Sequence, residues 1–347
     1  MIKKLLYSAG LITYASFSFS GFGLFANAQS VNYHLLKKVP LGTAPGGGEY
    51  FDYLFADSDA RRVYVSHGTE VKVGDADTGE VVGTITGLQK CHGIAVPPGN
   101  GKGFITDGEA GKVFVFDTAT LKITGEIKTA DDSDSIIYDP ASKHIFAFNG
   151  DSHSASVIDP ASATLVKTID TGGGPEFAVA DGRGKVFNNI EDKNELVAID
   201  SQALTIKARW PVAPAGAPTA LAMDREHRRL FSAGRKPQMV VMMDADSGKV
   251  LQSLPISAGA DAAVFEDRTG LLFVSTREGK VHIFHEDSPT KLSEAATLKT
   301  EYGAKTMALD TKTQNLYLST AEFTQPASAG GRREPKPGTF HLLIYSR

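Results

Sequence analysis

Residues 62–68 (RVYVSHG), 71–75 (VKVGD) and 78–85 (TGEVVGTI) decide the fold of this chain. Within each segment apolar and polar side chains alternate, which is the pattern of a half-buried β-strand. Polar residues or glycines separate the segments, as they do at turns between short strands. The sequence therefore predicts three consecutive short strands.

This unit recurs along the chain. The aromatic residue of its first strand occurs seven times, at Tyr64, Phe104, Phe146, Phe187, Phe231, Phe273 and Tyr317. The aspartate that ends its second strand recurs at intervals of 41 to 44 residues, at Asp75, Asp117, Asp159, Asp200 and Asp244. With an inner strand before each aromatic strand, the pattern predicts an all-β, seven-bladed β-propeller of four-stranded blades. We expect the aromatic residues to pack between blades and the aspartates to form turns.

The two ends of the repeat array complement each other. Residues 31–42 form a predicted strand without a local partner, and the last repeat ends on its third strand at 342–347. We expect the N-terminal strand to be the outer strand of the last blade and to close the ring, since closure removes open sheet edges. Residues 29–347 are predicted to be one domain, with blades at 43–88, 89–131, 132–173, 174–215, 216–259, 260–303 and 304–347.

Residues 1–28 have the pattern of a secretory signal peptide. Lys3 and Lys4 precede an apolar stretch, and Ala26-Asn27-Ala28 is a small-x-small cleavage site. An uncleaved membrane anchor is the alternative, because the apolar stretch is long. Its serines and glycines favour cleavage, and no cysteine follows it that could carry a lipid. We expect an exported protein, periplasmic in a Gram-negative host or secreted.

Composition excludes several classes of protein. The chain has 347 residues, of which 41% are hydrophobic, and a net charge of −4. The acidic balance disfavours nucleic-acid binding, which needs clustered Lys and Arg. Cys91 is the only cysteine, so an internal disulfide and a Cys-rich zinc site are impossible. We expect Cys91 to be a small buried hydrophobe rather than a nucleophile, and the protein to be a monomer.

The first two segments resemble the repeat of a known propeller family. The YVTN repeat reads Tyr-Val-Thr-Asn, then Val-x-Val-Ile-Asp, then Thr-Gly-x-Val. Its first element is similar to residues 63–67 (VYVSH), 104–107 (FITD) and 317–320 (YLST), and its second to 71–75 and 113–117 (VFVFD). The resemblance covers nearly the whole mature chain. It implies an exported seven-bladed protein of the YVTN-repeat (YncE-like) family, in which binding or scaffolding is the usual role. Related propellers include lactonases and a metal-dependent lyase, so an enzyme stays an alternative.

The starts of the inner strands are expected to line one mouth of the central channel. Aligning the seven inner strands selects Asp52, His92, Asp134, Glu176, Thr219, Asp261 and Lys305. Four are carboxylates, and such a ring is costly unless water, Lys305, His92 or a bound cation compensates it. We expect a polar, acidic funnel that binds a small molecule, a cation or a partner protein. The alternative is a solvated mouth in which each carboxylate caps a backbone amide.

Two functional alternatives concern the same mouth. Asp52, His92, Asp134 and Glu176 are suitable ligands for a divalent metal ion, which could serve a lactonase-like hydrolase or lyase. The aromatic strands end at His67 and Asp107, where the YVTN repeat often has asparagine. We expect these two residues to join Asp52 and His92 in the most reactive corner of the funnel. The chain has no Gly-x-Ser-x-Gly, His-Glu-x-x-His or Walker motif.

One loop interrupts the last blade. Residues 325–338 (QPASAGGRREPKPG) are rich in proline and glycine and carry Arg332, Arg333 and Lys336. The simple interpretation is a surface loop. The alternative is a lid or a partner contact, because loops on rigid scaffolds often carry function.

Overall fold

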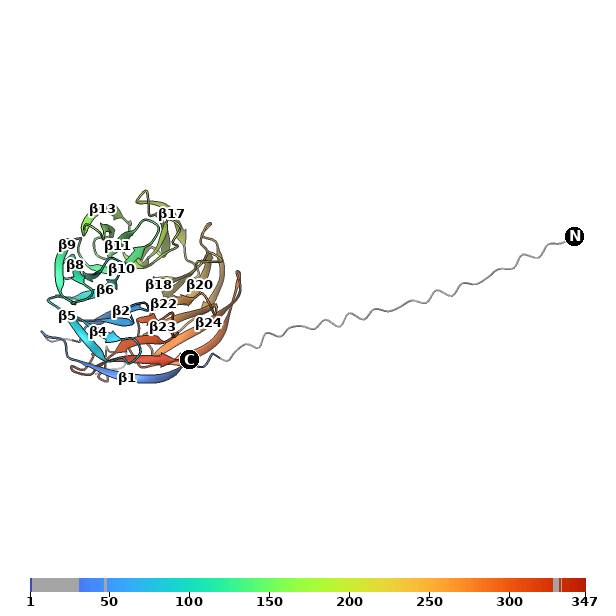
Figure 1. Cartoon of the computed structure of the whole chain (residues 1–347). Helices are drawn as coiled ribbons and strands as arrows, with labels where there is room; N and C mark the ends of the chain where they lie inside the picture. Colours follow the sequence, from blue (N-terminus) through green and yellow to red (C-terminus); the bar gives the residue numbers. More distant parts are fainter. Residues whose placement is uncertain (2–30, 47–48, 327–330, 332) are drawn as a thin grey trace. The chain divides into compact units, whose positions relative to one another are not determined.

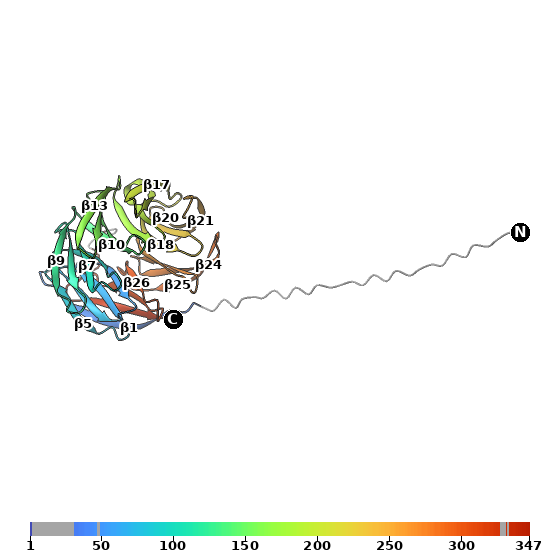
Figure 2. The ribbon, with the colours of Figure 1, turned by 45° about the horizontal axis from the view of Figure 1, so that its top comes forward.

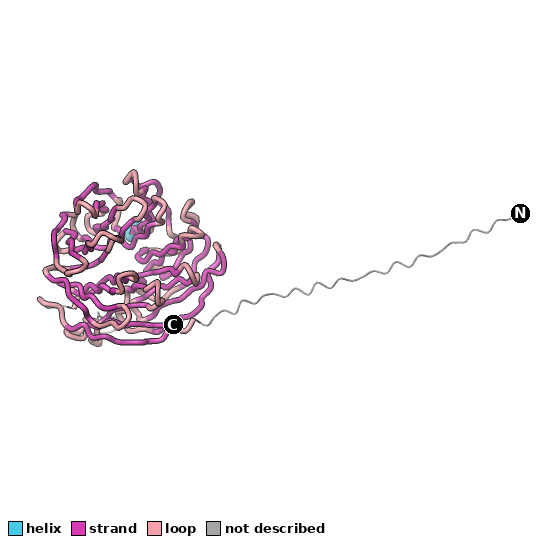
Figure 3. The backbone as a smooth tube through the Cα atoms, viewed as in Figure 1, coloured by secondary structure: helices cyan, strands magenta, loops and turns pink. Residues whose placement is uncertain are grey.

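Each repeat folds as short antiparallel strands, as the alternating pattern predicts, and every blade has four of them. The computed structural model describes Met1 and residues 31–46, 49–326, 331 and 333–347, so the predicted signal peptide lies outside the described residues except for Met1. Seven four-stranded sheets form a ring of blades, a β-propeller (Figure 1). Figure 3 shows how strands dominate the described part; its one short helix is the 3-10 turn η1 (Glu191–Lys193).

Six blades are each built from one continuous segment. Blades 1 to 3 comprise β2 (Phe51–Asp57), β3 (Arg62–His67), β4 (Glu70–Asp75), β5 (Val81–Thr86); β6 (Cys91–Ala95), β7 (Lys102–Asp107), β8 (Lys112–Asp117), β9 (Ile123–Lys128); and β10 (Ser133–Asp139), β11 (His144–Asn149), β12 (Ser154–Asp159), β13 (Thr164–Asp170). Blades 4 to 6 comprise β14 (Pro175–Ala180), β15 (Lys185–Ile190), β16 (Glu195–Asp200), β17 (Thr205–Pro211); β18 (Pro218–Asp224), β19 (Arg229–Arg235), β20 (Gln238–Asp244), β21 (Val250–Pro255); and β22 (Ala260–Glu266), β23 (Leu271–Thr276), β24 (Lys280–Ser288), β25 (Lys291–Lys299).

Blade 7 combines the two ends of the described chain. It contains β26 (Met307–Leu309), β27 (Leu316–Thr320) and β28 (Phe340–Ser346), and β1 (His34–Gly42) is its outer strand. β1 pairs antiparallel with β28, with Val39 opposite Leu342. In Figure 1 the blue β1 accordingly lies beside the marked C-terminus. Among the described residues, no helix is long and apolar enough to cross a membrane.

The core lies between neighbouring blades. The seven recurring aromatic residues are at most 1% exposed, which confirms that they are core residues. Tyr64 of blade 1, for example, belongs to one apolar cluster with Ile105 and Phe116 of blade 2. The recurring aspartates are turn residues, also as predicted: Asp75 Oδ1 accepts hydrogen bonds from the backbone N–H of Asp77 and Thr78.

The inner strands surround the propeller axis (Figure 2). Those of blades 1 to 6 share an irregularity near their starts. In blade 1, Phe51 pairs with His67 and Leu54 with Val65, so the inner strand has one residue more than its partner. The inner strands of blades 2 to 6 have the same one-residue excess. A bulge of this kind bends the strand and redirects side chains. It places the second residue of each inner strand outside the regular ladder.

Candidate functional site

The residues predicted from the strand starts occupy equivalent positions. Asp52, His92, Asp134, Glu176, Thr219 and Asp261 are each the second residue of their inner strands, and Lys305 lies just before β26. We call these seven residues the hub. The main chain of the hub is held across blades: Ser135 Oγ of blade 3 donates a hydrogen bond to the carbonyl of Glu176 in blade 4, and hydroxyls of Thr106 and Ser275 do the same for Asp134 and Lys305.

Ion pairs join the hub residues of neighbouring blades. Lys305 Nζ lies 2.9 Å from Asp52 Oδ1 and 2.5 Å from Asp261 Oδ2. Arg235, at the end of β19, contacts Asp261 through Nη2 and lies 3.2 Å from Glu191 Oε1 through Nη1. These contacts connect blades 1, 7, 6, 5 and 4 in order. The sign of the charge alternates at every step.

His92 continues the series on the other side. Its Nδ1 lies 2.8 Å from Asp52 Oδ2 and 2.8 Å from Asp134 Oδ1. The complete series is Asp134, His92, Asp52, Lys305, Asp261, Arg235 and Glu191, one residue from each blade, and we call it the ion-pair chain. The compensation that a ring of acids requires is thus supplied by the protein's own cations.

The pKa values follow from this arrangement. Burial opposes the charged form of His92, but the hydrogen bond to Asp52 and the nearby negative charge of Asp134 outweigh burial and raise its pKa to about 10. Burial also works against Asp52, yet Lys305 and His92 hold its pKa below the usual range. Asp134 shares His92 without a second cation, so burial raises its pKa. His92 is therefore charged at neutral pH.

Glu176 stands apart from the ion-pair chain. It lies in blade 4, and burial together with the nearby charge of Asp134 raises its pKa well above the ordinary value. The charged form of Glu176 is therefore disfavoured by its surroundings. Thr219 is buried, and its hydroxyl donates to the carbonyl of Ala217 at 3.3 Å. Neither residue is a member of the ion-pair chain.

Two tyrosines that the sequence reasoning missed complete the hub. The hydroxyl of Tyr50 lies 3.0 Å from Asp52 Oδ2 and 2.9 Å from His92 Nδ1. Tyr53 donates to Asp134 Oδ2 at 3.3 Å, and its ring packs on Phe177 at 4.8 Å between centroids. Both tyrosines lie within two residues of Asp52, in the segment 50–53 (YFDY), and this proximity in the sequence could have indicated their role.

Glu191 and Arg235 were also missed, although they share a position in the repeat. Each follows the residue that pairs with the first residue of the inner strand. The same position holds Arg277 in blade 6, and Gly68, Gly108 and Gly150 in blades 1 to 3. At Gly108 a Cβ atom would lie 2.8 Å from His92 Nε2. This position thus holds a charged residue in blades 4 to 6 and a glycine in blades 1 to 3. An alignment of all strands of the blades would have revealed this difference.

The predicted corner of His67 and Asp107 with Asp52 and His92 is not assembled. His67 Nε2 lies 2.7 Å from Glu49 Oε2, and its ring stacks on Phe340 of blade 7 at 4.0 Å. Asp107 accepts hydrogen bonds from backbone N–H groups, including that of Lys90 at 3.1 Å. Both side chains point into seams between blades, where local partners satisfy them, instead of toward the axis.

One group of hub atoms has the spacing of metal ligands. Asp52, His92 and Asp134 each offer one ligand atom within 4.8 Å of the others. Glu176, the fourth predicted ligand, does not belong to this group. Nitrogen and carboxylate oxygen are suitable donors for zinc and similar ions. A metal there would replace the proton on His92 Nδ1.

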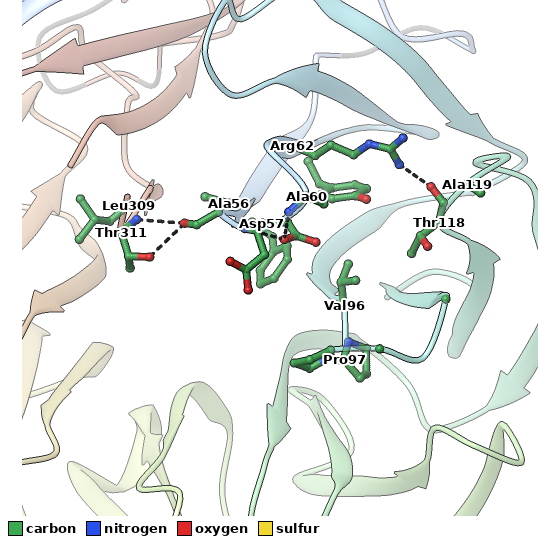
Figure 4. A pocket seen from close by; sticks show the side chains of 17 residues that line it. Ala56, Asp57, Ala60, Arg62, Val96, Pro97, Thr118, Ala119, Leu309 and Thr311 are labelled. Atoms are coloured by element: carbon green, nitrogen blue, oxygen red, sulfur yellow. Dashed lines mark hydrogen bonds between the residues drawn. The ribbon is translucent and has the colours of Figure 1, made fainter. Parts of the chain in front are cut away.

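Two of the cavities lie at opposite ends of the inner strands. The mouth pocket, of about 180 Å³, adjoins the hub and is lined by Tyr50, Arg277, Tyr302, Lys305, Phe323 and Arg333 among others. A larger cavity of about 730 Å³ lies where the inner strands end, near Asp57 and Leu309 (Figure 4). Its polar groups are occupied locally: Asp57 accepts from Ala60 N–H, and Arg62 donates to the carbonyl of Thr118. The mouth pocket is therefore the better candidate for a ligand.

The loop at 325–338 reaches this mouth. Phe323 and Pro335 form an antiparallel bridge at its base, and Gly338 N–H donates to the buried Glu49 carboxylate at 2.6 Å. The guanidinium of Arg333 lies over the Tyr302 ring at 4.6 Å. Arg332 lies outside the described residues. The described flanks of the loop thus form one wall of the mouth pocket.

Comparison with known proteins gives a family and the fold. The family model described as "Domain of unknown function (DUF5074)" matches residues 71–321. A chain of hydrazine synthase from Kuenenia stuttgartiensis is similar in structure, with 16% identity, a TM-score of 0.69, and coverage of 80% of this chain and 96% of that one. The protein U3-55K is similar with 9% identity, a TM-score of 0.72, and coverage of 90% and 98%. No curated protein matches. At these identities the structural likeness concerns the fold alone.

Proposed function

This chain belongs to the family described as a domain of unknown function (DUF5074), and because that description names no activity we propose its function from the hub: a non-enzymatic binding propeller that takes a small molecule at the hub mouth. The observation that carries the proposal is the ion-pair chain, which neutralises the hub carboxylates from within. Because the charged hub side chains are already paired with one another, they form a rigid surface, and a preorganised surface favours ligand binding.

We also propose where the protein acts and which kind of partner it binds. The pattern of residues 1–28 supports export to the periplasm or beyond. The resemblance of the strands to the YVTN repeat supports a binding role outside the cytoplasm. The net charge of −4 supports a small molecule or a protein partner over nucleic acid. We expect the mature protein to act as a monomer.

A second candidate function is a metal-assisted, lactonase-like hydrolase or lyase. The observation that favours it is the spacing of Asp52, His92 and Asp134. A divalent ion held there would polarise a carbonyl or activate a water. In that case His92 would bind the ion through a neutral ring, and Tyr50 would lie beside the reacting group.

Native purification followed by mass spectrometry and elemental analysis separates the two candidates. For a binding propeller we expect a small non-covalent adduct on the wild type that is absent from Tyr302→Ala, less than one metal per chain, and a Tm unchanged by chelator. A matched variant, Tyr138→Ala in β10, should keep the adduct. One metal per chain, together with lactone turnover lost in Asp52→Asn, would establish the enzyme instead. Absence of both an adduct and a metal would contradict both candidates.

A further inference from the structure

The mouth pocket has a chemical character that differs from the rest of this acidic protein. Three cationic side chains, Arg277, Lys305 and Arg333, line a cavity of about 180 Å³. Among the described lining residues Glu49 is the one acid; its side chain has no exposed surface, and its carboxylate is bonded to His67 and to Gly338 N–H. The pocket is therefore electropositive in spite of the net charge of the chain.

The three cationic side chains of the pocket differ in their interaction partners. Lys305 is held by Asp52 and Asp261. Within the described part of the chain, the guanidinium of Arg277 forms no ion pair or hydrogen bond, and that of Arg333 lies over the face of Tyr302. A guanidinium presents several donors in a planar fork that fits a carboxylate with two parallel hydrogen bonds. Two such forks at one cavity, neither of them in an ion pair with a described carboxylate, favour an anionic ligand.

The other wall of the pocket is aromatic. The rings of Tyr302 and Phe323 meet edge to face, with centroids 5.0 Å apart, and Phe51 lies 6.5 Å from Phe323. Gly303 makes this arrangement possible: its φ is +84°, and a Cβ atom there would lie 2.4 Å from the Phe323 ring. Aromatic walls favour flat apolar groups, which stack on ring faces or meet ring edges. The pocket thus offers a surface for a ring next to donors for an anion.

The size of the cavity limits the ligand. A volume of about 180 Å³ equals that of roughly six waters at about 30 Å³ each, and it is smaller than the roughly 300–1,000 Å³ of pockets for drug-sized ligands. One ring with one small charged substituent matches such a space.

We propose that the mouth pocket binds a small aromatic carboxylate, with the carboxylate between Arg277 and Arg333 and the ring against Tyr302 and Phe323. The inference rests on the proposed binding function and names the class of its ligand. Charge supplies one part of the recognition and the aromatic wall the other. A neutral compound with the same ring, or an inorganic anion without a ring, lacks one of the two parts.

The test is a titration of the full mature chain with 4-fluorobenzoate, followed by fluorine NMR and calorimetry. We expect saturable binding of one molecule per chain, with Kd raised at least tenfold in Arg333→Gln and in Arg277→Gln. Arg183→Gln is the matched control, because Arg183 is exposed in a turn of blade 4 and forms no ion pair within the described chain. An unchanged Tm in each variant shows that the fold is intact.

Two further probes test the two halves of the recognition. We expect 4-fluorobenzamide, with the same ring and no charge, and inorganic phosphate, with charge and no ring, each to bind at least tenfold more weakly. Equal binding of 4-fluorobenzamide, equal binding of phosphate, or no effect of either arginine variant would overturn the proposal. If the native protein carries an adduct at the hub but does not bind 4-fluorobenzoate, the ligand class is wrong and the binding function stands. If neither is seen, both fail.

Discussion

Replacing Lys305 with methionine removes the cation that lies between two buried carboxylates while keeping most of the side-chain volume. Lys305 Nζ lies 2.9 Å from Asp52 Oδ1 and 2.5 Å from Asp261 Oδ2, and both aspartates are at most 7% exposed. Breaking a buried ion pair from one side costs about 3–5 kcal/mol, because the remaining charge is left without compensation. We expect Lys305→Met to lower the free energy of unfolding by about 4 kcal/mol at pH 7.

Thermal and urea unfolding measure this loss. The entropy of unfolding of a chain of about 320 residues is roughly 0.7 kcal/mol/K, so a loss of about 4 kcal/mol lowers Tm by about 6 °C. The effect should shrink at acidic pH, because without Lys305 the buried Asp52 is protonated more readily. Adding Asp52→Asn and Asp261→Asn to the variant should restore most of the stability, since neutral groups need no cation.

A surface pair is the matched control. Lys112 Nζ lies 2.8 Å from Glu126 Oε1, with side-chain exposures of 33% and 53%. Lys112→Met should cost less than about 1 kcal/mol. If Lys305→Met costs no more than Lys112→Met, or if its cost does not depend on pH, the argument for an internally compensated hub is refuted.

Three further predictions concern the hub, the mouth pocket and the lone cysteine. The pKa of His92 is raised to about 10, so its stabilising contribution is complete below about pH 6.5 and is lost as pH rises through 10. The urea midpoint should therefore fall more between pH 7 and 10.5 in the wild type than in His92→Gln. An equal fall of the midpoint in the two proteins would count against a charged His92. Gly303→Ala should lower stability by about 1–3 kcal/mol and weaken aromatic carboxylate binding, whereas Gly99→Ala, also at positive φ but with nothing within 4 Å of the added Cβ, should cost less and leave binding unchanged. Burial raises the pKa of Cys91 to about 12, so a disulfide reagent should modify no thiol in the folded protein and one in urea; rapid native labelling would show that the thiol is accessible.

Most of the fold could be predicted from the sequence repeat. The aromatic residues and aspartates recur because each blade packs and turns in the same way, so their spacing predicted blades and inner strands. The equivalence of Asp52, His92 and Lys305 followed from that alignment, and the structure brings Asp52 into contact with both of the others.

The pairing within the hub was beyond the sequence. Contacts such as that of Lys305 with Asp52 join residues at opposite ends of the chain, and no local pattern encodes their distance. His67 was misplaced because a strand-end side chain is free to turn into the seam between blades, where Glu49 and Phe340 receive it. Arg235 was missed because it lies on the second strand, outside the set of inner strands that was aligned.

The charge of the His92 ring tests the central claim most directly. Nitrogen NMR on protein labelled at histidine, with His92→Gln to assign the signal, reports whether both ring nitrogens carry protons. With Asp52 and Asp134 both 2.8 Å from Nδ1, we expect a doubly protonated ring at pH 8 that loses its proton near pH 10. A neutral ring at pH 8, or a signal that shifts on removal of a bound metal, would contradict a hub neutralised by its own side chains.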